Sequence, residues 1–129
     1  MEKYLNVIKE SGAKLTNPRK KVLHNLFTAN KPLTLQEIHQ NCSRVDFASV
    51  YRTIKLFTEI NLVEEITFAD NKTRYELVSK LHHHHIICSS CGEISQLPIC
   101  LLSEIESFTN YKITKHILEF MGLCPSCQN

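Results

Sequence analysis

A stretch of ten residues rich in metal-binding side chains lies in the second half of this 129-residue chain. From His82 to Cys91 it reads HHHHIICSSC, so that four imidazoles run into a Cys-x2-Cys pair. A second Cys-x2-Cys pair follows near the end of the sequence, after 32 intervening residues. Two such thiolate pairs, brought together by a fold, form the closed tetrahedral set of a structural zinc site. We predict one structural zinc ion with the ligands Cys88, Cys91, Cys124 and Cys127.

Disulfides and a redox pair of the thioredoxin type are the two other uses of such cysteines. The sequence starts without a signal peptide, so we expect a cytoplasmic protein with reduced thiols. Neither pair opens a helix after a strand within a βαβ pattern, which is where a thioredoxin-type pair is found. Zinc is therefore the expected partner of the four thiolates.

The four consecutive histidines cannot all serve one metal ion if they lie on a strand. Successive side chains of a strand point to opposite faces, which groups His82 with His84 and His83 with His85. The alternation predicts two separate sites, one towards the hinge between the domains and one within the C-terminal domain. A single site with spare surface imidazoles is the alternative that the sequence leaves open.

A zinc enzyme needs an open coordination position and a general base, and the chain lacks the motifs that supply them. It contains no His-Glu-x-x-His motif. The segments His116-x-x-Glu119 and Cys124-Pro125-x-Cys127 do not match the zinc deaminase pattern. We therefore expect no enzymatic activity.

Composition and charge indicate a globular protein whose first half meets an anionic partner. Hydrophobic residues make up 43% and charged residues 22% of the chain. No apolar run approaches the ~20 residues of a membrane span, so we expect no association with a membrane. Residues 1–62 carry ten Lys or Arg against five Asp or Glu, whereas residues 81–129 carry two against four. The positive excess of the first half favours an anionic partner.

The first 80 residues have the pattern of a winged helix. Apolar spacing and capping residues predict helices over 2–11 and 17–28, a helix of about two turns after Thr34, and a fourth helix after Asp46. Strand-forming segments then flank the turn-prone sequence at 70–72. Such a helix-turn-helix with a two-stranded wing predicts DNA binding, with the fourth helix in the major groove.

The fourth helix carries the residues that we expect at the DNA. Tyr51 and Arg52 lie early in it, where recognition helices place their base and phosphate contacts. Tyr51 and Phe47 also fit its apolar stripe, and Thr53 falls among its polar residues. The alternative function for this half is a three-helix interaction domain, which would make the protein a zinc-stapled protein–protein adaptor without metal-dependent DNA binding.

The second half is predicted to be a small α+β domain. A strand is expected over 93–97, a helix over 101–109, and a further strand or strand pair over 112–121. So few elements cannot cover both faces of a sheet, and pairing with a second copy of the chain is the expected remedy. The fold class is therefore α+β, with a winged-helix domain at 1–80, a hinge at 79–81, and a zinc-stapled dimerisation domain at 81–129.

Taken together, these motifs resemble the ferric uptake regulator (Fur) family of metal-dependent repressors over nearly the full chain. The segments that carry the resemblance are 14–19, 48–52, 75–77 and 82–92. The resemblance implies a homodimer that binds a palindromic, AT-rich operator in response to iron or zinc, or to manganese. It also implies a DNA-binding set of Lys14, Arg19, Ser49, Tyr51 and Arg52, in which Lys14 matches a minor-groove lysine.

The resemblance further implies two regulatory metal sites besides the structural zinc. The hinge-side site takes Glu76, His83 and His85, and the second site takes His82 and His116. The sequence reads Lys31-Pro32-Leu33 where the family has a further hinge-site histidine, so the hinge site lacks one ligand.

The second site departs from the family pattern at two positions. His84 occupies a position that is usually Asp, and Cys100 falls near the place where an acidic ligand is expected. Cys100 is thus a candidate ligand together with His82, His84 and His116. A small buried hydrophobe is the other use of a lone cysteine, and Glu104 is then the alternative ligand.

Overall fold

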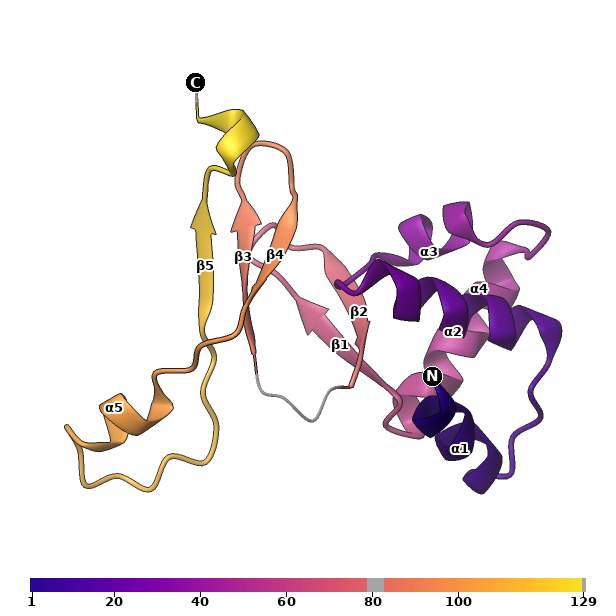
Figure 1. Cartoon of the computed structure of the whole chain (residues 1–129), viewed down its shortest axis with the longest axis horizontal. Coiled ribbons are helices and arrows are strands. Elements are labelled where there is room, and N and C mark those ends of the chain that lie inside the picture. Colours follow the sequence, from indigo (N-terminus) through magenta and orange to yellow (C-terminus); the bar gives the residue numbers. More distant parts are fainter. Residues whose placement is uncertain (79–82, 129) are drawn as a thin grey trace. The chain divides into compact units, whose positions relative to one another are not determined.

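The computed structural model of the chain describes residues 1–78 and 83–128, which form two compact units, Met1–Val78 and Ser79–Asn129. The boundary between the units lies two residues before the predicted one. The predicted hinge at 79–81 and the predicted ligand His82 lie outside the described residues. Each unit is a separate arrangement of helices and strands (Figure 1).

The first unit begins with four helices, α1 (Glu2–Glu10), α2 (Asn17–Ala29), α3 (Leu35–Asn41) and α4 (Phe47–Glu59). The predicted caps are confirmed at two of them. The Thr16 side chain accepts a hydrogen bond from the Arg19 N–H at the start of α2. At α3, Thr34 Oγ1 accepts from the Glu37 N–H at 3.1 Å while Glu37 Oε1 accepts from the Thr34 N–H at 2.9 Å. These bonds satisfy backbone donors that have no partner within the helix, and so they determine where each helix begins.

The apolar faces of the helices meet in one core. α4 packs against α2 and α3, and Val50, Ile54 and Phe57 of α4 are almost fully buried. Thr53 is also buried, at 5% exposure, so its predicted position on the polar face was wrong. A helix turns 100° per residue, which brings position 53 onto the same side as positions 50, 54 and 57. Phe47 and Tyr51 are 45% and 50% exposed, so the apolar-stripe interpretation of these two residues was wrong as well.

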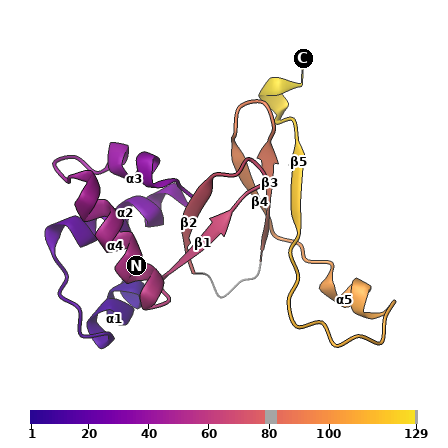
Figure 2. The ribbon, with the colours of Figure 1, turned by 180° about the vertical axis from the view of Figure 1, so that it is seen from behind.

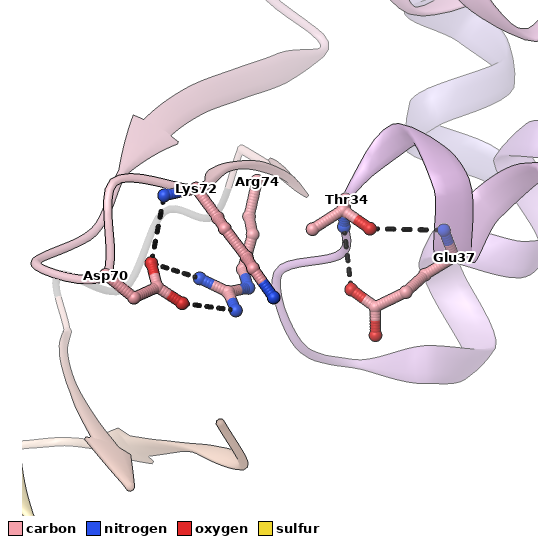
Figure 3. A network of polar contacts seen from close by, with 5 residues as sticks. All are labelled: Thr34, Glu37, Asp70, Lys72 and Arg74. Carbon is pink, nitrogen blue, oxygen red and sulfur yellow. Dashed lines mark hydrogen bonds and ion pairs between the residues drawn. The ribbon is translucent and has the colours of Figure 1, made fainter. Parts of the chain in front are cut away.

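The predicted wing is an antiparallel hairpin of β1 (Val63–Thr67) and β2 (Thr73–Leu77). Its turn is held by Asp70, whose carboxylate accepts hydrogen bonds from the Lys72 N–H at 3.0 Å and from both terminal nitrogens of Arg74 at 3.1 and 2.9 Å (Figure 3). The Arg74 guanidinium also lies 5.2 Å from the centre of the Phe68 ring. This bidentate ion pair fixes the shape of the wing. The Lys72 side chain stays exposed at the tip of the wing.

The second unit is built on a three-stranded sheet with the order β4-β3-β5. β3 (His84–Cys88) pairs antiparallel with β4 (Ile94–Leu97) and parallel with β5 (Glu119–Gly122). The loop between β3 and β4 and the 3-10 helix η1 (Pro125–Cys127) lie at the same end of this sheet, as the opposite views of Figures 1 and 2 show. The short helix α5 (Leu102–Glu106) and the irregular segment after it extend beyond the other end.

The strand predicted over 112–121 is largely absent, because only 119–122 forms β5. In the parallel register His85 lies opposite Glu119, and β3 begins at His84. Residues before 118 therefore have no neighbouring strand among those described, and a strand needs one to satisfy its backbone groups. The helix predicted over 101–109 is likewise shorter, at five residues.

Hydrophobic helices long enough to cross a lipid bilayer do not occur among the residues that the structure describes.

Candidate metal centres and nucleic-acid interface

The four cysteines of the two Cys-x2-Cys pairs come together at one end of the sheet. Cys88 is the last residue of β3, the following turn presents Cys91, and the segment after β5 presents Cys124 and Cys127. Their sulfur atoms all lie within 4.8 Å of one another, and the Cys91 and Cys124 sulfurs are 3.7 Å apart. Two thiolates that each lie about 2.3 Å from a tetrahedral zinc ion are separated by about 3.8 Å. The spacing thus fits zinc, and the cysteines are free thiols, not disulfides.

Backbone groups and neighbouring sulfurs shift the acidity of these thiols in opposite directions. The Cys124 and Cys91 N–H groups each donate to the Cys88 sulfur at 3.4 Å and lower the pKa of Cys88 to about 6. Hydrogen bonding with the Cys124 side chain raises the pKa of Cys127 to about 12. Four thiolates so close together repel one another, and a divalent cation is what stabilises them. Metal loading therefore displaces protons, and the affinity of this set for metal increases with pH.

The histidines at 83–85, just before and within the start of β3, separate into two groups, as expected for extended chain. The rings of His83 and His85 lie 4.8 Å apart, whereas the ring of His84 lies 5.2 Å from that of His116. His84 is buried, with 6% of its surface exposed. Adjacent residues thus contribute to different clusters, because side chains alternate along the strand. The metal assigned to each cluster remains a prediction.

The second cluster contains His84, Cys100 and His116, whose ligand atoms lie within 4.8 Å of one another. Cys100 Sγ lies 3.4 Å from His116 Nε2. Glu104, predicted as the alternative ligand, is not a member of this group, and its carboxylate accepts a hydrogen bond from the Ser103 hydroxyl at 3.1 Å.

The hinge-side set divides between the two units. His83 and His85 belong to the second unit, whereas Glu76 lies on β2 of the first. The participation of Glu76 therefore remains a prediction. Pro32, at the position of the missing histidine, is fully buried, and the next residue, Leu33, exchanges backbone hydrogen bonds with Tyr75 at 3.0 and 2.7 Å.

The predicted DNA-binding residues lie on the surface of the first unit. Tyr51 and Arg52 are exposed on α4, and Arg52 donates a hydrogen bond to Ser49 Oγ at 3.4 Å. At the start of the same helix, the Ser49 hydroxyl donates to the carboxylate of Asp46 and lowers its pKa. These contacts order the first turns of α4 and leave the phenol and the guanidinium available to a partner.

Lys14 lies just before α2, and Arg19 lies in the first turn of that helix. The Arg19 guanidinium donates to the Lys14 carbonyl oxygen, which ties the loop before α2 to the helix. Arg74 was missed by the sequence analysis. The signal that could have revealed the ion pair of the wing was the opposite charge of Asp70, the first residue of the predicted turn, and Arg74, two residues after that turn.

Comparison with known proteins relates residues 10–121 to the model of the "Ferric uptake regulator family". A curated relative, the peroxide-responsive repressor PerR of Staphylococcus aureus, is 29% identical over 137 residues, which span 100% of this chain and 92% of that protein. The crystal structure of the Vibrio cholerae ferric uptake regulator matches with a TM-score of 0.77 at 27% identity, over 92% of this chain and 98% of that one.

Two further solved structures extend this likeness. The Helicobacter pylori ferric uptake regulator, described as having three functional metal binding sites, matches with a TM-score of 0.78 at 26% identity, over 99% of this chain and 91% of that one. A zinc-bound manganese uptake regulator shares the fold with a TM-score of 0.84 at 22% identity, over 94% of this chain and 98% of that one. The winged helix, the cysteine and histidine clusters and these matches together show that the chain belongs to the ferric uptake regulator family.

Proposed function

We propose that the chain is a metal-responsive, DNA-binding transcriptional repressor of genes for metal uptake and homeostasis. The observation that carries this proposal is the occurrence, in one chain, of a winged helix with an exposed Tyr51-Arg52 pair and of clustered metal ligands in a second unit. A place in the cytoplasm fits this function, because the operator is there.

Charge and exposure support DNA as the partner of the first unit. Residues 1–62 carry twice as many basic as acidic residues, with ten against five. DNA attracts such a surface through its phosphates, and an exposed Arg early in the recognition helix then contacts a phosphate or a base edge. Tyr51, half exposed at 50%, offers an aromatic ring to a base, most plainly to a thymine methyl group.

The metal ligands support two kinds of metal site. Zinc suits the four thiolates as a structural ion, because four sulfur ligands close its coordination sphere. The imidazoles of His83 and His85, with the carboxylate of Glu76 as the third predicted ligand, suit iron, zinc or manganese as a regulatory ion. Related proteins support iron and multiple sites. One solved relative from Francisella tularensis, 26% identical, contains iron, and the Helicobacter pylori relative is described as having three functional metal binding sites.

Exposed apolar side chains support a homodimer. In the second unit Phe108, Tyr111 and Ile117 are each more than 80% exposed. Large apolar residues at such exposure favour burial against another surface, and a second copy of the chain provides one. Two winged helices related by a two-fold axis would then read a palindromic, AT-rich operator.

The test is an electrophoretic mobility shift on AT-rich palindromic duplexes selected from a random pool, with and without zinc or iron(II). Metal-dependent binding is expected. Arg52→Ala should weaken it by about 5- to 150-fold and, if Arg52 contacts a phosphate, lower the salt slope by about one. Lys112→Ala, which removes one positive charge from the second unit, is the matched control and should bind like the wild type.

A zinc-stapled protein–protein adaptor is the alternative function. An adaptor would select no duplex from the pool, and metal would not change its mobility on DNA. Unaltered affinity of both Arg52→Ala and Tyr51→Ala at two salt concentrations would place the DNA interface elsewhere.

A further inference from the structure

We infer that Arg44, in the connection between α3 and α4, binds a phosphate group of the DNA backbone, and that its backbone is strained because this contact requires an arginine. The inference rests on the DNA binding proposed above. It adds to the contacts of Tyr51 and Arg52 a residue that the sequence did not single out.

The backbone of Arg44 has the left-handed conformation, with φ at 61°. Among the residues that the structure describes, three others besides glycine have a positive φ, and all three are asparagines, Asn30, Asn61 and Asn71. Asparagine tolerates this conformation because its short side chain bonds locally to the backbone, whereas other side chains crowd the following carbonyl oxygen. Arg44 is the exception, and its conformation costs folding free energy that asparagine would not cost.

The packing on both sides of Arg44 explains why the chain needs this conformation. Cys42 and Val45 are both buried in the core of the first unit, at 4% and 8% exposure. Only Ser43 and Arg44 separate them, so the chain turns sharply within two residues. Lys21 Nζ donates to the Ser43 carbonyl oxygen at 2.8 Å and ties this turn to α2. Turns of helix-turn-helix motifs often contain glycine, and here an arginine has the glycine-like backbone.

The side chain of Arg44 has no role in holding the fold together. It is exposed, and its guanidinium forms no hydrogen bond or ion pair with the residues in the described ranges 1–78 and 83–128. Asp46, two residues further along the chain, accepts a hydrogen bond from the Ser49 hydroxyl instead. Neither burial nor an internal ion pair accounts for an arginine at a strained position, and such strain is typical of functional sites.

Positive charge surrounds the turn that contains Arg44. Residues 14–55 carry eight Lys or Arg against two Asp or Glu. On the α2 side of the turn, Lys20 and Lys21 line a hollow of about 590 Å³ together with Ser43 and neighbouring residues. This concentration of positive charge favours a polyanion as the partner of the turn.

The position of Arg44 just before α4 favours a phosphate over a base. A helix rises 1.5 Å per residue, so Phe47, the first residue of α4, lies only about 7.5 Å along the axis from Arg52. The major groove is about 12 Å wide and is bordered by the phosphate backbones. With Tyr51 and Arg52 at the base edges, the connection before Phe47, which projects from the first unit in Figures 1 and 2, comes to this border. A guanidinium there can bind two phosphate oxygens at once.

Urea unfolding of the full-length, zinc-loaded protein tests the strain. Arg44→Asn should raise the unfolding midpoint of the first unit by about 0.5 M, because asparagine adopts the left-handed conformation more readily. Arg44→Ala removes the guanidinium but retains a side chain that disfavours this conformation, so it is the matched control and should unfold at the wild-type midpoint. A midpoint for Arg44→Asn at or below that of the wild type would overturn the inference.

DNA binding at several salt concentrations tests the contact. Arg44→Ala and Arg44→Asn should each weaken binding about tenfold near about 0.1 M salt and lower the salt slope by about one, whereas Arg44→Lys keeps the charge and should keep the slope. The loss should be equal on a selected palindrome and on an unrelated duplex, because a phosphate contact carries no sequence information. Lys112→Asn, which removes one positive charge from the second unit, is the control and should bind like the wild type. Wild-type affinity and slope in Arg44→Asn would overturn the inference.

The same binding curves separate this inference from the proposed function. If the wild type binds a palindrome only with metal and Arg44→Asn binds it equally well, the function stands and the inference fails. If Arg44→Asn loses affinity and salt slope but metal changes the DNA binding of neither protein, the Arg44 contact stands and the metal-responsive function fails.

Discussion

The two units of the chain rely on different sources of stability. The first unit buries a continuous apolar cluster that includes Ile8, Leu23 and Phe57. Among the described residues of the second, only Ile87, Cys88 and Ile94 are buried apolar residues, and several large apolar side chains are exposed instead. A unit of about 50 residues with so small a core needs an additional source of stability. We therefore expect hydrophobic burial to be enough for the first unit, and we expect the second unit to depend on the proposed zinc ion and on a partner surface.

The largest expected effect is that of breaking the four-cysteine set. Cys91→Ser should unfold the second unit and leave the first folded, because zinc binding to such sites contributes about 10–16 kcal/mol of apparent free energy that is also folding free energy. Two-dimensional NMR would show the loss of dispersed signals from residues 83–128 alone. Ser95→Ala, at an exposed position of β4 outside the cysteine set, should retain the dispersed signals. A folded Cys91→Ser protein with an unaltered melting temperature would refute the assignment of a structural zinc.

The next largest effect should come from creating a cavity in the core of the first unit. Phe57 is fully buried on α4, and Phe57→Ala should lower the free energy of unfolding of the first unit by about 3–5 kcal/mol. Urea unfolding followed by circular dichroism would measure this loss. If zinc removal destabilised the first unit as much as this substitution, the two units would not be independent in stability.

The same substitution at an exposed phenylalanine should act on assembly instead. Phe108 is 85% exposed, so Phe108→Ala should leave chain folding nearly unaffected. It should weaken the proposed homodimer by about 1–2 kcal/mol if Phe108 is a central contact, which is about 5- to 30-fold in the dissociation constant. Sedimentation equilibrium at several protein concentrations would detect the change. An unchanged dimer would place the interface on another face.

The smallest effect should come from the capping box of α3. Thr34→Ala removes the acceptor of the Glu37 N–H and should cost the first unit about 1 kcal/mol. Thr34→Ser keeps the hydroxyl and should restore most of that loss in the same urea experiment. Equal stability of the Ala and Ser variants would mean that water satisfies this N–H as well as the side chain does.

Local signals were enough to predict most of the first unit. Helix starts at Thr16 and Thr34 follow from short-range hydrogen bonds, and the wing turn follows from the residues at 70–72. The α+β class and the family were also predicted correctly. Thr53 was placed incorrectly because its hydroxyl was given more weight than its helical position.

Long-range pairing explains what the sequence did not reveal. Whether residues 112–118 form a strand depends on a neighbouring strand that local propensity cannot supply, and β5 is therefore shorter than predicted. The Asp70–Arg74 ion pair was missed because it depends on the exact reach of two side chains across a turn. At the metal sites, the alternation of side chains along a strand was enough to predict that His83 and His84 belong to different clusters. The 3.4 Å approach of Cys100 to His116 could not be predicted, because Cys100 lies in a segment without regular secondary structure and therefore without a sequence periodicity.

The alternation of side chains along β3 also limits how this protein can change during evolution. A point substitution at His84 alters the cluster with Cys100 and His116 and leaves the His83–His85 pair as it is. Metal preference at one cluster can therefore drift while the other is conserved by selection. An insertion or deletion of one residue within β3 would instead exchange the two faces and displace Cys88 from the other sulfurs. The length of this strand should thus vary far less among descendants of the sequence than the identity of its histidines.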